Sequence, residues 1–104
     1  MKIVVKKPKE KGTIIEGENK LETYQNIVGG YIETYSLVND ILIVLNEEGI
    51  LEGLEHNMLI RPHMNEYKDT ALIVGTVAFV SEDNGDFKEL NEGQLETLRQ
   101  FNFI

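Results

Sequence analysis

The sequence predicts an α+β fold for residues 1–104 as a single domain: a small antiparallel or mixed sheet of about five strands with two packed helices, the second of them C-terminal. Three observations support this prediction. Short runs rich in β-branched and aromatic residues recur along the chain, separated by turn residues. Two other segments space their apolar residues as helices do, and each follows a capping pattern. The length of 104 residues suits one domain with one modest core.

The chain is predicted to begin with a β-hairpin and a helix. Ile3–Val5 is typical of a strand, and Thr13–Ile15 pairs back against it after a lysine-rich turn. Asn19 is a suitable N-cap for a helix over about residues 20–28, with a glutamate three residues later to complete a capping box. Gly29 follows as a left-handed C-cap. The helix is expected to place its apolar residues on one face: Leu21, Tyr24, Ile27 and Val28.

The middle of the chain predicts two strands and a less regular segment. Tyr31–Tyr35 alternates polar and apolar residues, which indicates a strand with one face in water. Ile41–Leu45 is apolar at every position, which suits a central strand covered on both faces. After a turn, Ile50–Leu51 is expected to return as a short strand. Residues 52–70 are interpreted as a loop with a helical turn, in which only Met58–Ile60 is buried.

The last third predicts one long strand and the second helix. Ala71–Val80 is the strongest strand pattern, and Gly75 inside it indicates a bulge or a close backbone approach. A polar turn over Glu82–Asp86 leads to a helix capped by Asn91, with a glutamine three residues later closing the capping box. This helix is expected to pack on the sheet through Leu95, Leu98 and Phe101.

Composition excludes several classes of protein. The chain has no cysteine, so disulfides and thiolate chemistry are excluded. It shows no secretion signal, and its longest apolar run, Ile41–Leu45, is too short to cross a membrane, so we expect a cytoplasmic protein. The net charge is −8, but residues 1–12 carry five lysines and one glutamate, whereas the remainder carries five basic and 17 acidic side chains. Such an acidic body disfavours binding to nucleic acids and membranes.

No catalytic or metal-binding set is recognised. The two histidines, His56 and His63, are separated by the helix breaker Pro62 and lack the one-turn spacing of a zinc helix. Neither serine, Ser36 or Ser81, lies in a nucleophile elbow. We therefore predict a protein that is not an enzyme and that uses no metal and no cofactor.

Four sequence blocks resemble a known family. They are VGGYIE at residues 28–33, NEEG at 46–49, IVGT at 73–76, and Asp86-Phe87 leading into the Leu90–Gln94 helix start. Their order and spacing resemble DUF3846, a domain of unknown function carried mainly by phages, plasmids and Gram-positive bacteria. The resemblance implies no established activity. It does imply a mobile-element setting in a host cell, where short acidic proteins without catalytic residues act as counter-defence factors, some by imitating DNA and others by sequestering nucleotide signals.

The leading hypothesis is sequestration of a nucleotide-type host immune signal, such as a cyclic or ADP-ribose-type nucleotide. Arg61 would hold phosphate, Asn57 and His63 would supply polar contacts, and Tyr31 would stack on the base. The hydroxyl of Thr76 lies beside a bare glycine backbone against which a ligand could lie. A monomer this small encloses little, so the site is expected between subunits of a homo-oligomer.

Two other readings stay open. The strongly acidic body could bind a basic host defence or restriction protein in the manner of a DNA mimic. An enzyme such as a phosphodiesterase ranks lowest, because no nucleophile or metal set is present.

Overall fold

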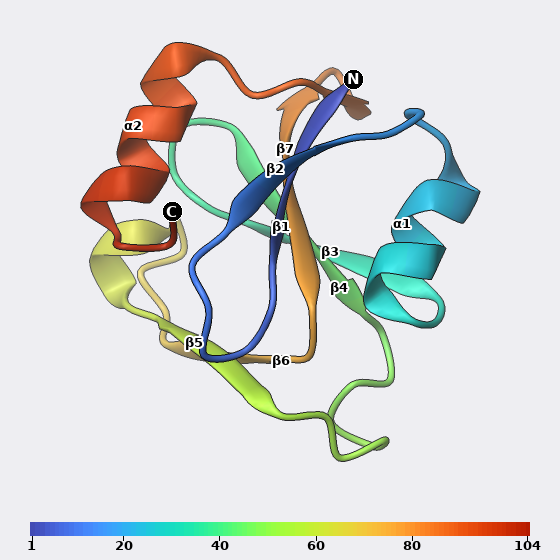
Figure 1. The fold of residues 1–104 in the computed structure, drawn as a ribbon. Helices are drawn as coiled ribbons and strands as arrows, with labels where there is room; N and C mark the ends of the chain where they lie inside the picture. Colours follow the sequence, from blue (N-terminus) through green and yellow to red (C-terminus); the bar gives the residue numbers. More distant parts are fainter.

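The computed structural model describes residues 1–104 and confirms the predicted α+β class (Figure 1). Its main sheet has six strands, all paired antiparallel, and β5 and β6 form a second, two-stranded sheet. The order along the main sheet is β2 (Thr13–Glu16), β1 (Lys2–Lys6), β7 (Val77–Asp83), β4 (Ile41–Asn46) and β3 (Ile32–Ser36), with β8 (Asp86–Lys88) also paired to β7. The remaining elements are α1 (Leu21–Val28), β5 (His56–Ile60), the 3₁₀ turn η1 (Pro62–Met64), β6 (Ala71–Val74) and α2 (Glu92–Gln100).

The two central strands separate two layers of core. As predicted, β4 is covered on both faces: all six of its residues are buried. Its residues Ile41 and Ile43 face the larger core, together with Phe79 of β7. Leu42 and Val44 point the other way, into a smaller core with Tyr24 of α1. This alternation follows from the two-residue period of a strand.

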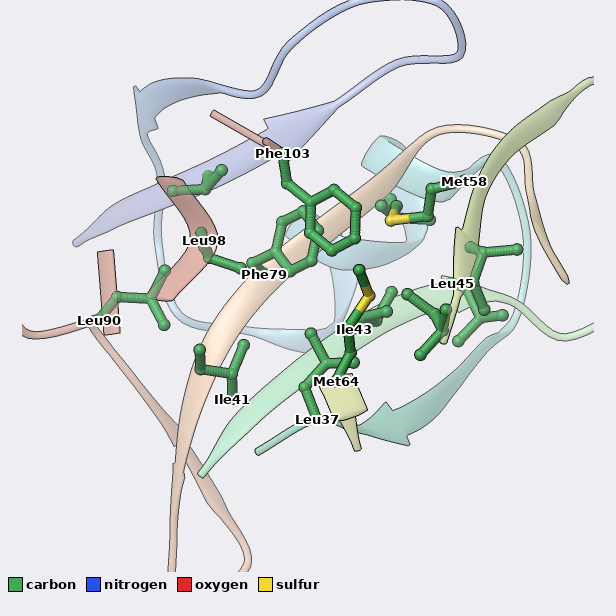
Figure 2. Packing of buried hydrophobic residues seen from close by; sticks show 14 residues of the cluster. Leu37, Ile41, Ile43, Leu45, Met58, Met64, Phe79, Leu90, Leu98 and Phe103 are labelled. Atoms are coloured by element: carbon green, nitrogen blue, oxygen red, sulfur yellow. The ribbon is translucent and has the colours of Figure 1, made fainter. Parts of the chain in front are cut away.

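The larger core is closed by α2, by the C-terminal residues and by the β5–β6 sheet. Phe103 stacks on Phe79, with 5.7 Å between ring centroids, and Leu98 of α2 packs beside them (Figure 2). Met58 of β5 and Met64 of η1 fill the opposite side of the same core (Figure 2). The predicted packing of α2 is therefore confirmed.

The two helices differ in how their N-termini are capped. In α2 the predicted capping box is present: Asn91 Oδ1 accepts from the Gln94 N–H at 2.8 Å, and Gln94 Oε1 accepts from the Asn91 N–H at 2.9 Å. In α1 the prediction is wrong, because the N-cap residue is Lys20, which makes no side-chain cap bond. Asn19 instead accepts from the Tyr24 hydroxyl at 2.6 Å and donates to the Phe87 carbonyl at 2.7 Å, so it joins α1 to β8.

The buried face of α1 is narrower than predicted. Tyr24 and Val28 are buried, whereas Leu21 is 57% exposed. Gly29 is in the left-handed conformation as predicted, with φ of 81°, and its N–H donates to the Gln25 carbonyl at 2.8 Å.

Three other sequence predictions need correction. Ile50–Leu51 is not a strand but part of an exposed turn, with 77% and 87% of the two residues accessible. The segment 52–70 contains the predicted helical turn, but also β5, in which Leu59 is exposed. Ala71–Val80 is two strands in different sheets, divided at Gly75, which adopts φ of +77°.

A larger residue at Gly75 would be strained. A Cβ atom would lie 2.7 Å from Leu54 Cδ1, and a positive φ disfavours other residues. Gly75 therefore marks a left-handed corner between the two sheets, and the group that approaches its Cα is the Leu54 side chain. Neither helix is long and apolar enough to span a bilayer.

Candidate functional site

Two of the predicted ligand-binding residues lie on one exposed segment. Arg61 directly follows β5, and His63 lies in η1. Both are exposed, and the His63 ring contacts the Phe101 ring edge to face, with centroids 5.9 Å apart. Figure 1 shows this segment beside the C-terminal end of α2.

Asn57 is engaged inside the protein. Its side-chain amide donates to the carbonyls of Lys6 and Gly75, at 2.9 and 2.7 Å, and its Oδ1 accepts from Lys6 Nζ at 2.6 Å. Thr76 is half-buried just after the Gly75 corner. The hydrogen-bonding capacity of Asn57 is thus used to join β1, β5 and this corner.

Tyr31 lies far from Arg61. It follows α1 and is 70% exposed, and Figure 1 shows that α1 and η1 lie on opposite sides of the molecule. Within one subunit the structure therefore brings Arg61 and His63 onto one segment but does not place Tyr31 with them.

The largest hollow of the surface, about 550 Å³, surrounds Tyr31. It lies between the end of α1, the glycines that follow, and the turn after β4. We call it the acidic cleft, and its lining residues are Gln25, Asn26, Gly29, Gly30, Tyr31, Asn46, Glu48 and Glu52.

The side chain of Asn46 connects the residues around the acidic cleft by hydrogen bonds. This residue is only 4% exposed. Its amide nitrogen donates to Glu52 Oε1 at 2.8 Å and to the Val28 carbonyl at 3.3 Å, and its Oδ1 accepts from the Glu48 N–H at 2.8 Å. A Cβ atom on Gly30 would come within 3.0 Å of this amide. The network holds the turn against the end of α1 and fixes one carboxylate in place.

The acidic cleft is electrostatically negative. Glu48 and Glu52 both line it, and no lysine, arginine or histidine does. The C-terminal end of α1 adds the negative pole of the helix dipole. Such a site attracts an ammonium or guanidinium group and repels phosphate. The exposed Tyr31 ring adds a face on which a cation can lie.

The structure shows no cluster of three or more histidine, aspartate or glutamate side chains placed to hold a metal ion. The acidic cleft accordingly offers two carboxylates, amides and an aromatic ring, a set suited to hydrogen bonding and to cation recognition.

Sequence reasoning did not find the acidic cleft. Local patterns predict a helix end at Gly29 and a turn before Ile50, and neither pattern by itself indicates a cleft. The missing information was the β3–β4 register, which places Ile32 opposite Asn46 and so brings Tyr31 beside the turn. The spacing of Glu48 and Glu52 is the one sequence feature that could indicate the acidic cleft, because two carboxylates four residues apart can lie on the same side of a compact turn.

Comparison with known proteins identifies the family. Residues 1–102 match the family model for a domain of unknown function (DUF3846). The chain belongs to this family. The match includes the N-terminal hairpin, so the DUF3846 region extends beyond the blocks that carry the sequence resemblance. No curated protein and no solved structure matches the chain.

Proposed function

We propose that this DUF3846 protein is a non-catalytic binding protein that docks on a basic protein partner and takes a lysine or arginine side chain of that partner into the acidic cleft. The observation that carries the proposal is a cleft of about 550 Å³ with two carboxylates at the negative end of a helix and no basic residue in its lining. This is the partner class expected for the acidic-mimic reading of the sequence.

The residues of the acidic cleft supply complementary contacts for such a side chain. Glu48 and Glu52 offer acceptors for a charge-assisted hydrogen bond, which is stronger than a neutral one. The Tyr31 ring offers a cation–π contact, worth about 0.5–1 kcal/mol at an exposed site. Together these features favour a guanidinium or an ammonium over a neutral side chain.

The charge of the rest of the protein supports the same partner. Residues 13–104 carry 17 acidic and five basic side chains, so a basic protein is attracted before contact. In the mobile-element setting that the family resemblance implies, a basic host defence or restriction protein fits this description, and binding it would be a counter-defence activity.

The test uses a short arginine-rich peptide and isothermal titration calorimetry at low and moderate salt. The variant Glu48→Gln with Glu52→Gln removes both charges, while the amide oxygen introduced at position 52 can still accept from Asn46. Glu66→Gln with Glu82→Gln is the matched control, because it changes the net charge equally at exposed positions outside the acidic cleft.

We expect the double variant in the acidic cleft to weaken binding about tenfold, and the control to weaken it about twofold through long-range attraction alone. Equal weakening by the two double variants would refute the acidic cleft as the site. Binding that does not depend on salt would remove the electrostatic basis of the proposal.

Nucleotide sequestration stays a separate prediction, and one observation favours it: Arg61 is exposed beside His63, whose ring lies on Phe101. A titration with a panel of cyclic and ADP-ribose-type nucleotides tests it. Binding that Arg61→Gln abolishes and that Glu48→Gln leaves unchanged would replace the basic-partner proposal with this one.

A further inference from the structure

A second hollow adjoins the acidic cleft and has a different character. It encloses about 240 Å³ between β3, β4, the Ile50–Leu51 turn and β6, and most of its lining residues are apolar. We call it the β3–β6 groove. Asn46 lines both hollows, so the β3–β6 groove and the acidic cleft form one continuous surface around the turn after β4.

One side of the β3–β6 groove is formed by Glu33 and Tyr35 of β3, a strand whose outer edge carries unused hydrogen-bonding groups. β3 is the terminal strand of the main sheet and pairs only with β4. Just before β3, the Glu47 N–H donates to the Tyr31 carbonyl at 2.9 Å. Because every second residue of an antiparallel strand bonds to its partner strand, the N–H and C=O groups of Glu33 and Tyr35 also point toward β4. The intervening residues direct their N–H and C=O groups to the free edge: Ile32, Thr34 and Ser36.

The other side of the β3–β6 groove is a strand edge. All four residues of β6 line the β3–β6 groove, although successive side chains of a strand point to opposite faces. This pattern means that the edge of β6, and not one of its faces, borders the hollow. β6 pairs only with β5, so this edge too is free.

A buried polar atom without a partner lies at the β3–β6 groove. Tyr35 lines it, and the Tyr35 hydroxyl is buried and makes no hydrogen bond. Burial, followed by the nearby Asp69 and Tyr67, raises the pKa of Tyr35, so its hydroxyl keeps the proton that it could donate. Unpartnered buried hydroxyls are uncommon, and an ordered water or a bound group can supply the acceptor.

The rim of the β3–β6 groove combines exposed apolar side chains with negative charge. Ile50, Leu51 and Leu72 are 77%, 87% and 45% exposed. Glu33 and Glu47 also line it, and both are exposed. An occupant that satisfies both features carries apolar side chains and positive charges.

We propose that an extended segment of the partner adds to the free edge of β3 as an additional strand. Its main chain bonds to the outward groups of Thr34 and its neighbours, its apolar side chains lie on Leu51 and Leu72, and a lysine or arginine lies beside Glu33 and Glu47. Strand addition of this kind derives affinity from main-chain hydrogen bonds and specificity from alternate side chains. The basic character of the partner rests on the proposed function.

The probe is a synthetic peptide of repeating Val-Thr-Lys-Thr, in which valine and lysine alternate along one face of the strand. Its binding is followed by NMR amide exchange. Binding should protect the amides of Thr34 and Ser36, which otherwise face solvent. Two N-methylated forms of the peptide provide the sharper test. One is methylated at the odd-numbered residues and the other at the even-numbered residues. Only one of these two sets of amides faces β3, so only one methylated form should lose binding, by about tenfold or more. No amide protection at saturating peptide, or equal binding of both N-methylated forms, would overturn the proposal.

The chain also offers a closely matched pair of variants. Leu72 and Leu59 pair across the β5–β6 sheet and are 45% and 42% exposed, but only Leu72 lines the β3–β6 groove. Leu72→Ser should weaken peptide binding several-fold and Leu59→Ser should leave it unchanged, whereas equal effects would contradict the assignment. Light scattering provides one more test. If the wild type is a dimer and Leu72→Ser makes it a monomer, a second copy of the chain occupies the β3–β6 groove and the proposal is overturned.

The two proposals can fail separately. If the arginine-rich peptide binds the acidic cleft but the alternating peptide protects no amide of β3, the proposed function stands and strand addition is wrong. If the amides of β3 are protected while Glu48→Gln with Glu52→Gln has no more effect than its control, strand addition stands and the role of the acidic cleft is wrong.

Discussion

Replacing Asn57 should reveal how much of the fold depends on one polar side chain. Asn57 accepts from Lys6 Nζ and donates to the carbonyls of Lys6 and Gly75, at 2.6, 2.9 and 2.7 Å. In Asn57→Ala these three groups lose their partner together. Lys6 is only 6% exposed and no salt bridge includes it, so its ammonium has little alternative.

The expected loss of unfolding free energy follows from the two carbonyls and the one ammonium group that lose their hydrogen-bond partner. A buried carbonyl without its partner costs about 1–3 kcal/mol, and a hydrogen bond to a charged group contributes about 1.5–3 kcal/mol. Asn57 is itself only half-buried, so water can replace part of each bond and the lower ends of these ranges apply. We therefore expect Asn57→Ala to reduce the free energy of unfolding by about 3 kcal/mol, a fall in Tm on the order of 10–20 °C.

The assay is urea unfolding followed by far-UV circular dichroism, with the slope checked for two-state behaviour. Asn26→Ala is the control, because Asn26 is exposed on α1 and makes no side-chain hydrogen bond, so its free energy of unfolding should stay within about 0.5 kcal/mol of wild type. Adding Lys6→Met to Asn57→Ala should cost less than the two single changes combined, because the unpaired ammonium is then absent. A change below about 0.5 kcal/mol in Asn57→Ala would refute the reasoning and leave Asn57 free for a ligand.

Two further predictions concern charge and capping. Burial lowers the pKa of Lys6 below its ordinary 10.5, so the folded state binds fewer protons than the unfolded state, and the free energy of unfolding should rise with pH between that lowered pKa and 10.5. Burial raises the pKa values of Tyr24 and Tyr35 above 10.0, so their ionisation should reverse the trend at higher pH. Urea unfolding of wild type and Lys6→Met across this range checks both, and an identical rise in the variant would disprove the role of Lys6. Asn91→Ala should cost about 1 kcal/mol and lower the Tm by several degrees in a thermal melt, because it removes the α2 capping box, and an unchanged Tm would count against that bond.

The parts of the fold that could be predicted from sequence are those that local patterns determine. A run of apolar residues such as Ile41–Leu45 has few alternatives to a central strand, and the Asn91 capping box is complete within four residues. The failures have a physical reason as well. Ile50–Leu51 is apolar yet exposed, and a rule that equates apolar with buried assigns such a turn to a strand.

Long-range geometry explains the remaining differences. Ala71–Val80 gives one continuous strand pattern, and only the left-handed conformation of Gly75 sends its two halves into different sheets. Chemistry alone groups the candidate residues Tyr31 and Arg61, but α1, which precedes Tyr31, and η1, which follows Arg61, lie on opposite sides of the molecule (Figure 1). The acidic cleft depends on the β3–β4 register, which no local pattern contains.

The position of β7 has a kinetic consequence. This strand pairs with β1, β4 and β8, yet it comes late in the chain, and its Phe79 stands opposite Val4 at one edge and Ile43 at the other. The flanking strands β1 and β4 therefore come well before β7 in the chain. The long loops between them must close before any of these strand contacts can stabilise the fold. A topology so rich in non-local pairing has a high contact order, so folding on the millisecond-to-second scale is expected. Until β7 docks, the apolar β4 is left with an unpaired edge, the stage at which the folding chain is most prone to aggregate.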